Sequence, residues 1–275
     1  MGDAMAQAWQ RGRIMITVKT YPELSMKYRE TSCVAGIRLD RGRPHHVRLF
    51  PVPFRLLAGG SQFAKYAIVE VDVRRHSRDR RPESLRPNLD TLEVVGQVPS
   101  SNGWKQRYTY IEPLVAPSLC AIKRDQEERD TSLGIFRPAE VTDFRLAPAE
   151  PWPASKAALT DQLDLFDQDL RRLEWVPLEF RYRFRCADKQ CTGHDMALKD
   201  WEAGESYRKF LRRYGEHALR EKLRERWYEQ MFTADRAVHC FVGNIAAHPK
   251  TFMLLGLFYP RRDVVECVQA ELFSL

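Results

Sequence analysis

The stretch from Phe180 to Glu202 constrains the fold more than any other part of the sequence. It begins with strict alternation, in which phenylalanine or tyrosine occupies every second position and arginine stands between them. A period of two with aromatic residues predicts a half-buried β-strand. The strand is followed at once by Cys186, Cys191 and His194, in a C-x4-C-x2-H spacing. This stretch therefore predicts a strand that leads into a metal-binding turn.

The ligand types of this turn favour zinc, because thiolate and imidazole groups bind Zn2+ in tetrahedral sets of four. Three of the four ligands are Cys186, Cys191 and His194. The fourth is not local; our first candidate is Cys240, and the alternatives are His239, His217 and Asp195. We expect a structural site, since the strand and the helix that follow one another here need anchoring. The competing interpretation is that both cysteines are ordinary core residues.

Carboxylates close to the turn raise a second hypothesis, a metal-dependent nuclease. Its catalytic residues would be His194, Asp195, Asp200 and Glu202, because paired carboxylates can hold Mg2+. The competing interpretation, which we favour, is that Asp200 caps a helix starting near Trp201. The sequence has no G-x-S-x-G motif and no phosphate-binding glycine loop, so we expect binding rather than catalysis.

The charge of the chain favours a polyanionic partner. The formal net charge is +7, and such a balance is typical of proteins that bind nucleic acid. Arginines gather in one polar segment, and aromatic residues follow it. The candidate nucleic-acid-binding residues are Arg74, Arg75, Arg78, Arg80, Arg81, Arg86, Trp104 and Tyr108. Arginine pairs with phosphate and aromatic rings stack on bases, although a solvated loop would have a similar composition.

The first half of the chain is rich in short β-branched runs separated by glycine and proline turns. We expect strands over 14–19, 31–39, 45–57, 65–75 and 92–98. Strands of this length and spacing indicate a small barrel or sandwich. We expect four parts: a tail over 1–13, an OB-like barrel over 14–100, a second small β unit over 104–150, and a C-terminal α+β module over 151–275.

Within the C-terminal module the pattern changes to helical spacing. We expect helices over 155–173 and 205–232, the second with a break at Gly215. Two nearly continuous apolar runs, 237–245 and 250–260, predict a buried β-hairpin. The fold class that we expect is a β-rich α+β protein, with one or more OB-like barrels followed by an α+β module with a zinc-stabilised turn.

The N-terminal half resembles the opening of prokaryotic dual OB-fold proteins. The positions that carry the resemblance are Cys33, Ala35, Gly36, Val47, Arg48, Pro51, Glu83 and Ser84. The chain departs from the pattern in lacking a tryptophan before Arg48. The resemblance covers residues 14–145 and implies OB-type barrels with a nucleic-acid surface. It does not extend to residues 170–275.

From these features we predict a protein that binds single-stranded or structured RNA or DNA. The resemblance implies a component of a prokaryotic defence or RNA-processing system. A third hypothesis is a scaffold subunit that contacts another protein through its aromatic residues and apolar hairpin. The sequence shows no secretory leader and no long apolar run, and its cysteines are sparse. We therefore expect a cytoplasmic protein without a membrane partner.

Overall fold

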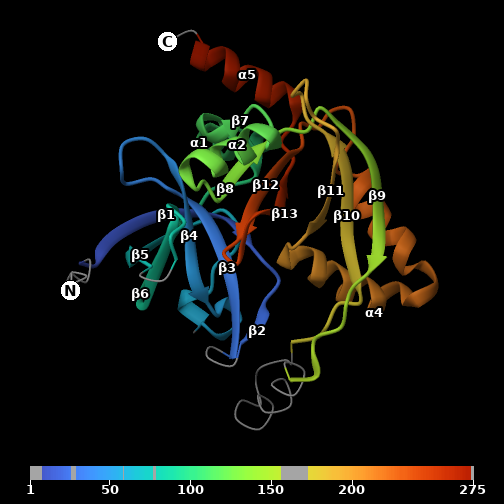
Figure 1. Ribbon diagram of the computed structural model, residues 1–275, viewed down its shortest axis with the longest axis horizontal. Helices are drawn as coiled ribbons and strands as arrows, with labels where there is room; N and C mark the ends of the chain where they lie inside the picture. The colour runs from blue at the N-terminus through green and yellow to red at the C-terminus, as the bar shows by residue number, and fades with distance from the viewer. Residues whose placement is uncertain (1–7, 26–28, 58, 77–78, 156–172, 274–275) are drawn as a thin grey trace.

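The computed structural model describes residues 8–25, 29–57, 59–76, 79–155 and 173–273. Two β-sheets make up most of the molecule (Figure 1). The first, formed by the N-terminal strands, lies to the left in Figure 1, and the second, formed by strands from the rest of the chain, lies to the right. No helix among the described residues is long and apolar enough to cross a bilayer.

The first sheet closes into a barrel. Its strands are β1 (Gln10–Lys19), β3 (Arg29–Arg38), β4 (His45–Val52), β5 (Ala67–Arg75) and β6 (Ser84–Gln97), with the short β2 (Glu23–Ser25) at the side of β3. The order is β1-β5-β6-β4-β3, and β3 pairs again with β1. Only β4 and β6 run parallel. This is the strand order of a five-stranded OB barrel, so the predicted OB-like barrel is confirmed.

The barrel interior is filled by aliphatic side chains that alternate along each strand. In β5 every second residue from Ala67 to Val73 is buried, and the residues between them are half-buried. β-branched residues pack well on a pleated surface. Two 3-10 turns, Phe54–Leu56 and Gly59–Ser61, connect β4 to β5. β1 begins at Gln10, so the end of the predicted N-terminal tail belongs to the barrel.

The second sheet has seven strands in the order β7-β8-β12-β13-β11-β10-β9. These strands are β7 (Val115–Ala116), β8 (Leu133–Phe136), β9 (Glu140–Pro148), β10 (Leu178–Arg185), β11 (His194–Leu198), β12 (His239–Ile245) and β13 (His248–Phe258). The predicted apolar hairpin is confirmed, since β12 and β13 pair antiparallel along their length. β8 and β9 share this sheet with the later strands, and the predicted domain boundaries stay a prediction.

The described residues form the helices α1 (Ser101–Ile111), α2 (Leu119–Arg129), α4 (Trp201–Arg224) and α5 (Arg262–Phe273). α4 continues into a π turn, Glu225–Glu229, and a 3-10 turn, Glu112–Leu114, follows α1. The predicted break is present, because Gly215 has φ +70°, which favours glycine. Most of the helix predicted for 155–173 lies outside the described residues.

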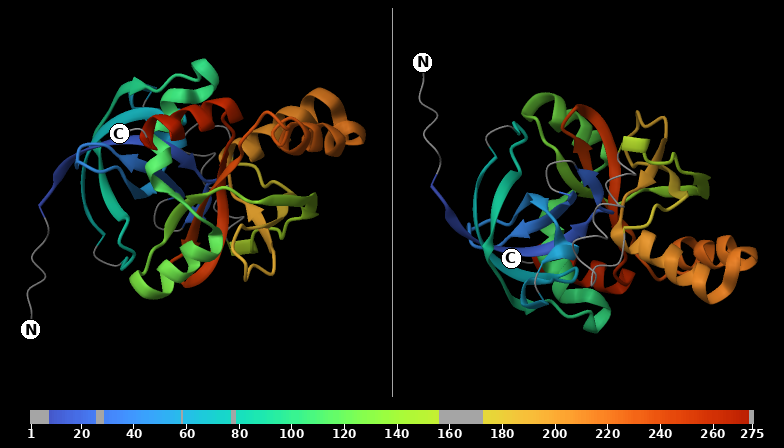
Figure 2. Two further views of the ribbon diagram at one scale, coloured as in Figure 1. Left: turned by 90° about the horizontal axis from the view of Figure 1, so that it is seen from above. Right: turned by 90° about the horizontal axis from the view of Figure 1, so that it is seen from below.

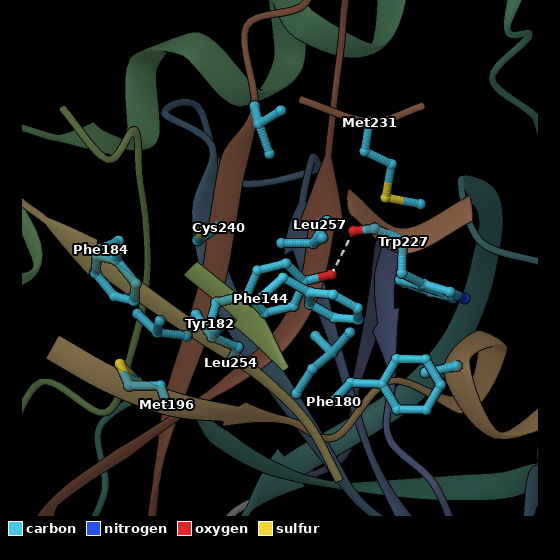
Figure 3. Packing of buried hydrophobic residues seen from close by; sticks show 14 of the residues in the cluster. Phe144, Phe180, Tyr182, Phe184, Met196, Trp227, Met231, Cys240, Leu254 and Leu257 are labelled. Atoms are coloured by element: carbon cyan, nitrogen blue, oxygen red, sulfur yellow. Dashed lines mark hydrogen bonds between the residues drawn. The ribbon is translucent and has the colours of Figure 1, made fainter. Parts of the chain in front are cut away.

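Figure 3 shows the side chains of the second sheet's core, to which Leu219 and Leu223 of α4 and Trp227 of the π turn also belong. Tyr182 is buried among Phe144, Phe180 and Trp227, and its hydroxyl donates to the carbonyl of Trp227 at 2.7 Å. Tyr182 and Phe180 point inward because successive side chains of β10 face opposite sides. The aromatic half of the alternating stretch therefore builds the core, and its arginines face solvent.

The barrel packs against the second sheet through its outer surface. Met15 and Ile37, from β1 and β3, are fully buried there, in one apolar cluster with Phe241, Leu255 and Phe258 of the hairpin. In OB barrels the face over the second and third strands, here β3 and β4, is a common ligand surface. Here the second sheet covers the β1–β3 part of the barrel wall.

Two polar contacts accompany this apolar seam. The Arg48 guanidinium of β4 donates to the hydroxyl of Ser132 at 2.6 Å and to its carbonyl at 2.9 Å. Glu83 accepts from the same Ser132 hydroxyl, also at 2.6 Å. Lys65, before β5, reaches Asp200 at the start of α4, with 2.5 Å between nitrogen and oxygen. Buried charges need hydrogen-bond or ion-pair partners. The Arg48 guanidinium is hydrogen-bonded and the Lys65 ammonium is ion-paired, so both contacts fix how the two sheets meet.

Arginines of α4 cover the outer edge of the second sheet. β9 is the last strand of the sheet, so one row of its backbone groups has no neighbouring strand. Arg220 donates to the carbonyl of Leu146 at 3.0 Å, and Arg224 donates to that of Phe144 at 2.9 Å. Part of the basic face of this helix thus serves the fold rather than a ligand.

Candidate metal centre and candidate nucleic-acid interface

The predicted metal-binding turn lies between β10 and β11. Cys186 directly follows β10 and is buried, and His194 is the first residue of β11. Asp188 shapes the turn by accepting from the backbone N–H groups of Gln190 at 2.9 Å and Cys191 at 3.1 Å. Gly193 has φ +97°, a conformation that favours glycine. These features bring Cys191 back beside Cys186, whose N–H donates to the Cys191 sulfur at 3.3 Å.

The fourth member of the group is Cys120, at the start of α2. The ligand atoms of Cys120, Cys186, Cys191 and His194 all lie within 4.8 Å of one another. His194 Nε2 lies 3.5 Å from the sulfur of Cys120 and 3.4 Å from that of Cys191. At Zn–S and Zn–N bond lengths of about 2.3 and 2.0 Å, tetrahedral ligands lie roughly 3.5–3.8 Å apart. The donor set and its spacing therefore fit zinc.

The elements that carry the four residues are held together independently of a metal. The side chain of Ser118 caps α2 by accepting from the N–H of Ala121 at 2.9 Å. Arg124, one turn further along α2, forms an ion pair with Asp188 in the turn, at 2.7 Å. A thiolate at Cys120 would lie in the first turn of α2, where the helix dipole stabilises negative charge.

Before an ion binds, the pKa shifts keep two of the thiols protonated and the imidazole neutral. Burial, with a contribution from Cys186 and Cys191, raises the pKa of Cys120 to about 12, and burial also raises the pKa of Cys186. At Cys191, burial is outweighed by donors that include the backbone N–H groups of Cys186 and Gly193, so its pKa is lowered. Burial and then Lys123 lower the pKa of His194. A divalent ion would compensate the clustered thiolates, while a neutral His194 can bind it.

The structure corrects the predicted fourth ligand. Cys240 is buried in the core of the second sheet, among the side chains shown in Figure 3, and it is not a member of the four-residue group. His239, one of the alternatives, is also buried, and its ring N–H at Nδ1 donates to the carbonyl of Ala237 at 2.8 Å. Cys120 was missed because it lies far upstream, in a helix without a recognisable ligand spacing.

The four residues of the nuclease hypothesis serve different structures. His194 belongs to the thiol cluster, whereas Asp195 faces the other side of β11 and accepts from Arg145, Arg181 and Arg183. Asp200 is the N-cap of α4 and accepts from the N–H of Glu202 at 2.9 Å. This confirms the capping interpretation. Within the described part of the chain, these four residues do not form a ligand group.

The candidate arginines divide into two sets. Arg74, Arg75, Arg80 and Arg86 lie at the end of β5, in the following loop and at the start of β6. Arg81 is instead committed to the structure, because it pairs with Asp79 at 2.7 Å and donates to the carbonyl of Asn244 at 2.8 Å. Within the first set, Arg75 also donates to a backbone carbonyl, that of Pro82. Burial of Asp79 is outweighed by hydrogen bonds from Arg81 and Ser84, which hold the pKa of Asp79 far below its usual range. Arg78 lies outside the described residues.

The two candidate aromatic residues lie on α1 and pack against the second sheet. Tyr108 is fully buried and packs near Phe258 and His239, so it cannot stack on a base. Trp104 packs against Phe258 and Tyr259, with ring centroids 5.3 and 4.5 Å apart. The prediction for Tyr108 is corrected by this burial, which the local sequence does not reveal. Trp104 is half-buried, and its role stays a prediction.

The structure shows a further tryptophan, the exposed Trp9, beside one of the candidate arginines; it was not among the residues expected from the sequence. Trp9 is 41% exposed, and the Arg74 guanidinium lies 4.5 Å from its ring centroid. Arg86 is the cross-strand partner of Arg74. On the other side of β1, Arg41 donates to the side chain of Gln10 at 2.6 Å. We use the term arginine rim for this end of the barrel, which comprises Trp9, Arg41, Arg43, Arg74, Arg75, Arg80 and Arg86.

The two sheets and the thiol cluster define the class of this protein. It is a β-rich α+β protein with an OB-type barrel and a candidate Cys3His metal centre. Residues 115–275 match the family described as Domain of unknown function (DUF8757), and residues 10–113 match Domain of unknown function (DUF8758). The first match covers more than half of the chain, which belongs to the DUF8757 family. No curated protein matches the sequence.

Two solved structures are similar to the chain at low identity. One is a murine DNA-binding protein bound to double-stranded DNA, with 8% identity, a TM-score of 0.29, and coverage of 91% of this chain and 94% of that chain. The other is a replication protein A heterotrimer bound to single-stranded DNA, with 12% identity, a TM-score of 0.21, and coverage of 97% and 70%. With TM-scores this low, the assignment of the barrel rests on its strand pairing.

Proposed function

We propose that this protein binds single-stranded nucleic acid at the arginine rim. The observation that carries the proposal is an exposed tryptophan, Trp9, with the Arg74 guanidinium over its ring, at the arginine-rich end of an OB-type barrel. Arginine pairs with phosphate in a planar, bidentate geometry, and a tryptophan face can stack on any base. This combination suits a single strand, whose bases are free to stack, better than a closed duplex.

The position of the rim within the barrel supports the proposal. In OB folds the loop between the fourth and fifth strands contacts oligonucleotides. Here that loop connects β5 to β6, and it contains Arg80 and the segment that the sequence singles out. Because the second sheet covers the β1–β3 side of the barrel, a strand would approach the barrel end instead.

Most charges at the rim are not cancelled by neighbouring carboxylates; the exception is Arg41, which lies 3.8 Å from Asp40. Among the described residues, Arg43, Arg80 and Arg86 have no ion-pair partner, and all three are exposed. The nearby acids Asp40 and Asp79 are already paired with Arg38 and Arg81. The rim therefore keeps a positive surplus that can replace the counterions of a phosphate backbone.

Charge reversal at the rim tests the proposal. Fluorescence anisotropy with labelled single-stranded DNA and RNA should show binding that weakens as salt is raised. The double variant Arg74→Glu, Arg86→Glu should bind at least about tenfold more weakly, with a smaller salt slope. Trp9→Ala should weaken binding by about tenfold, through lost stacking.

The matched control reverses two exposed arginines on α4, Arg212→Glu and Arg213→Glu. In both views of Figure 2, α4 (orange) lies on the side of the molecule opposite the dark-blue start of β1. This control removes the same net charge far from the rim and should retain most of the affinity. Equal losses in the two double variants would mean that only net charge matters, and no salt-dependent binding by the wild type would reject the function.

Within the same proposal, the metal is zinc and its role is structural. Four protein ligands would leave no open position for chemistry at the ion. Chelated and untreated protein should then show no difference in any nuclease activity, while their thermal stability should differ. A role in a prokaryotic defence or RNA-processing system, a protein partner and a cytoplasmic location stay predictions from the sequence.

A further inference from the structure

A second surface of the molecule has the opposite character to the arginine rim. A cavity of about 540 Å3 lies where the chain after β1, the ends of β9 and β11, and the starts of β10 and α4 come together. Its volume is within the range of about 300–1,000 Å3 that is typical of ligand sites. The residues that determine its character are Tyr21, Glu23, Glu150, Trp152, Trp175 and Glu179.

The aromatic walls of this cavity are fixed but accessible. Trp175 is 38% exposed, and its indole N–H donates to the carbonyl of Glu150 at 3.2 Å. Tyr21 stacks on Trp201 with ring centroids 5.4 Å apart, and Arg208 donates to its hydroxyl at 2.6 Å. Trp152 is half-buried at the same cavity. A tryptophan held in place and left partly exposed is available for contact with a ligand.

The charged groups of the cavity are predominantly acidic. Lys199 and Arg181 neutralise Glu179, with contacts of 2.8 and 3.0 Å. By contrast, the carboxylates of Glu23 and Glu150 have no ion-pair partner within the described part of the chain. In a chain of net charge +7, this places a negative field in an aromatic site, which repels a phosphate backbone and attracts a cation.

We propose that this cavity binds an arginine side chain presented by a partner protein. The planar guanidinium stacks on tryptophan faces through cation–π attraction, and its fork of N–H groups pairs with carboxylates. The cavity offers aromatic faces from Trp152 and Trp175, and it offers carboxylates from Glu23 and Glu150. It is also larger than one side chain, so residues on either side of the arginine fit within it.

Indole N–H signals in NMR spectra test the proposal on the full chain. Trp152→Phe and Trp175→Phe identify the two signals. Titration with the peptide acetyl-Gly-Arg-Gly-amide should shift both signals saturably, and the same peptide with neutral citrulline should not. Glu23→Gln and Glu150→Gln should each lower the affinity for the arginine peptide by up to about fivefold. Glu266→Gln, an exposed carboxylate on α5, should leave its affinity unchanged.

Three results would overturn the inference. The first is no saturable shift with the arginine peptide, and the second is an equal shift with the citrulline peptide. The third is a shift of both signals by a single-stranded oligonucleotide when the arginine peptide has no effect, which would make the cavity a base-binding site. Since the arginine rim takes no part in this experiment, its outcome is independent of nucleic-acid binding at the rim.

Discussion

Arg48 is the largest of the fully buried side chains in the described structure, with 1% exposure. It extends from the barrel to Ser132, and Glu83 accepts from the same serine. Three positions of the resemblance to dual OB-fold proteins, Arg48, Glu83 and Ser84, meet in this network. Their geometry assigns them to the contact between the two sheets and not to an exposed surface.

Replacing Arg48 by methionine should lower the free energy of unfolding by about 3 kcal/mol or more, because partners of a buried charge are left uncompensated. Urea denaturation measures this loss. Arg43→Met, at an exposed position, should change stability by no more than about 0.5 kcal/mol. If Arg48→Met were as stable as the wild type, the network would serve specificity of the fold and not its stability.

His239 gives the fold a defined pH dependence. Burial lowers its pKa from 6.5 to about 4, so the ring is neutral when folded. Between these two values the unfolded chain binds a proton that the folded chain does not. The contribution of neutral His239 to the free energy of unfolding is therefore fully present above about pH 6.5, and it is lost as the pH falls toward about 4.

We expect acidification from about pH 7 to about pH 4.5 to cost the wild type about 2 kcal/mol more than it costs His239→Gln. Urea denaturation at each pH measures the difference. His248→Gln, at an exposed position, should retain the pH dependence of the wild type. If the free energy of unfolding fell equally with pH in the wild type and in His239→Gln, His239 would have the same pKa in the folded and the unfolded chain.

At the scale of elements, the thiol cluster joins α2 to the β10–β11 hairpin across a long stretch of sequence. A metal bound by all four groups would act as a cross-link between them. Binding energy of this kind contributes directly to folding, because the site does not exist in the unfolded chain.

Elemental analysis should find about one zinc per chain in the wild type. Cys120→Ala should lose the metal and melt at a lower temperature, because one ligand and the cross-link are gone. Cys240→Ala should keep the metal, since Cys240 lies in the core outside the cluster. Zinc retained by Cys120→Ala and lost from Cys240→Ala would restore the ligand set expected from the sequence.

The elements themselves could be predicted wherever the pattern was local. Alternation identified β10, continuous apolar runs identified β12 and β13, and helical spacing with an Asp200 cap identified α4. Three of the four candidate ligands share one turn, so their spacing was visible as well. These predictions depend only on residues close together in the chain.

What could not be predicted depends on packing between distant segments. Cys120 approaches the turn because α2 packs beside the second sheet, and no spacing in the sequence encodes that. Tyr108 is polar enough to suggest a surface position, yet contact with Phe258 buries it. Trp9 was assigned to a tail because it precedes the apolar run of β1. In the structure, the pairing of Gln10 with Val73 extends β1 up to the residue after Trp9.

At the scale of the whole molecule, the barrel depends on the second sheet. The outward side chains of β1 and β3, including Met15 and Ile37, are fully buried by that contact. An apolar surface of this kind causes association when it is exposed to water.

A fragment of residues 1–113 should therefore aggregate or bind the dye ANS, whereas the full chain should do neither. Dye fluorescence and size-exclusion chromatography make the comparison. A monomeric fragment with a cooperative unfolding transition and no dye binding would show instead that the barrel folds on its own.

The capping of β9 by Arg220 and Arg224 has a consequence for self-association. Unpaired strand edges are where β-rich proteins add copies of themselves. At one margin of the second sheet, guanidinium groups already occupy two of the available carbonyls, and at the other margin β7 spans only Val115–Ala116. Growth into fibres by continuation of this sheet is thus obstructed at both borders, even though its interior is strongly apolar.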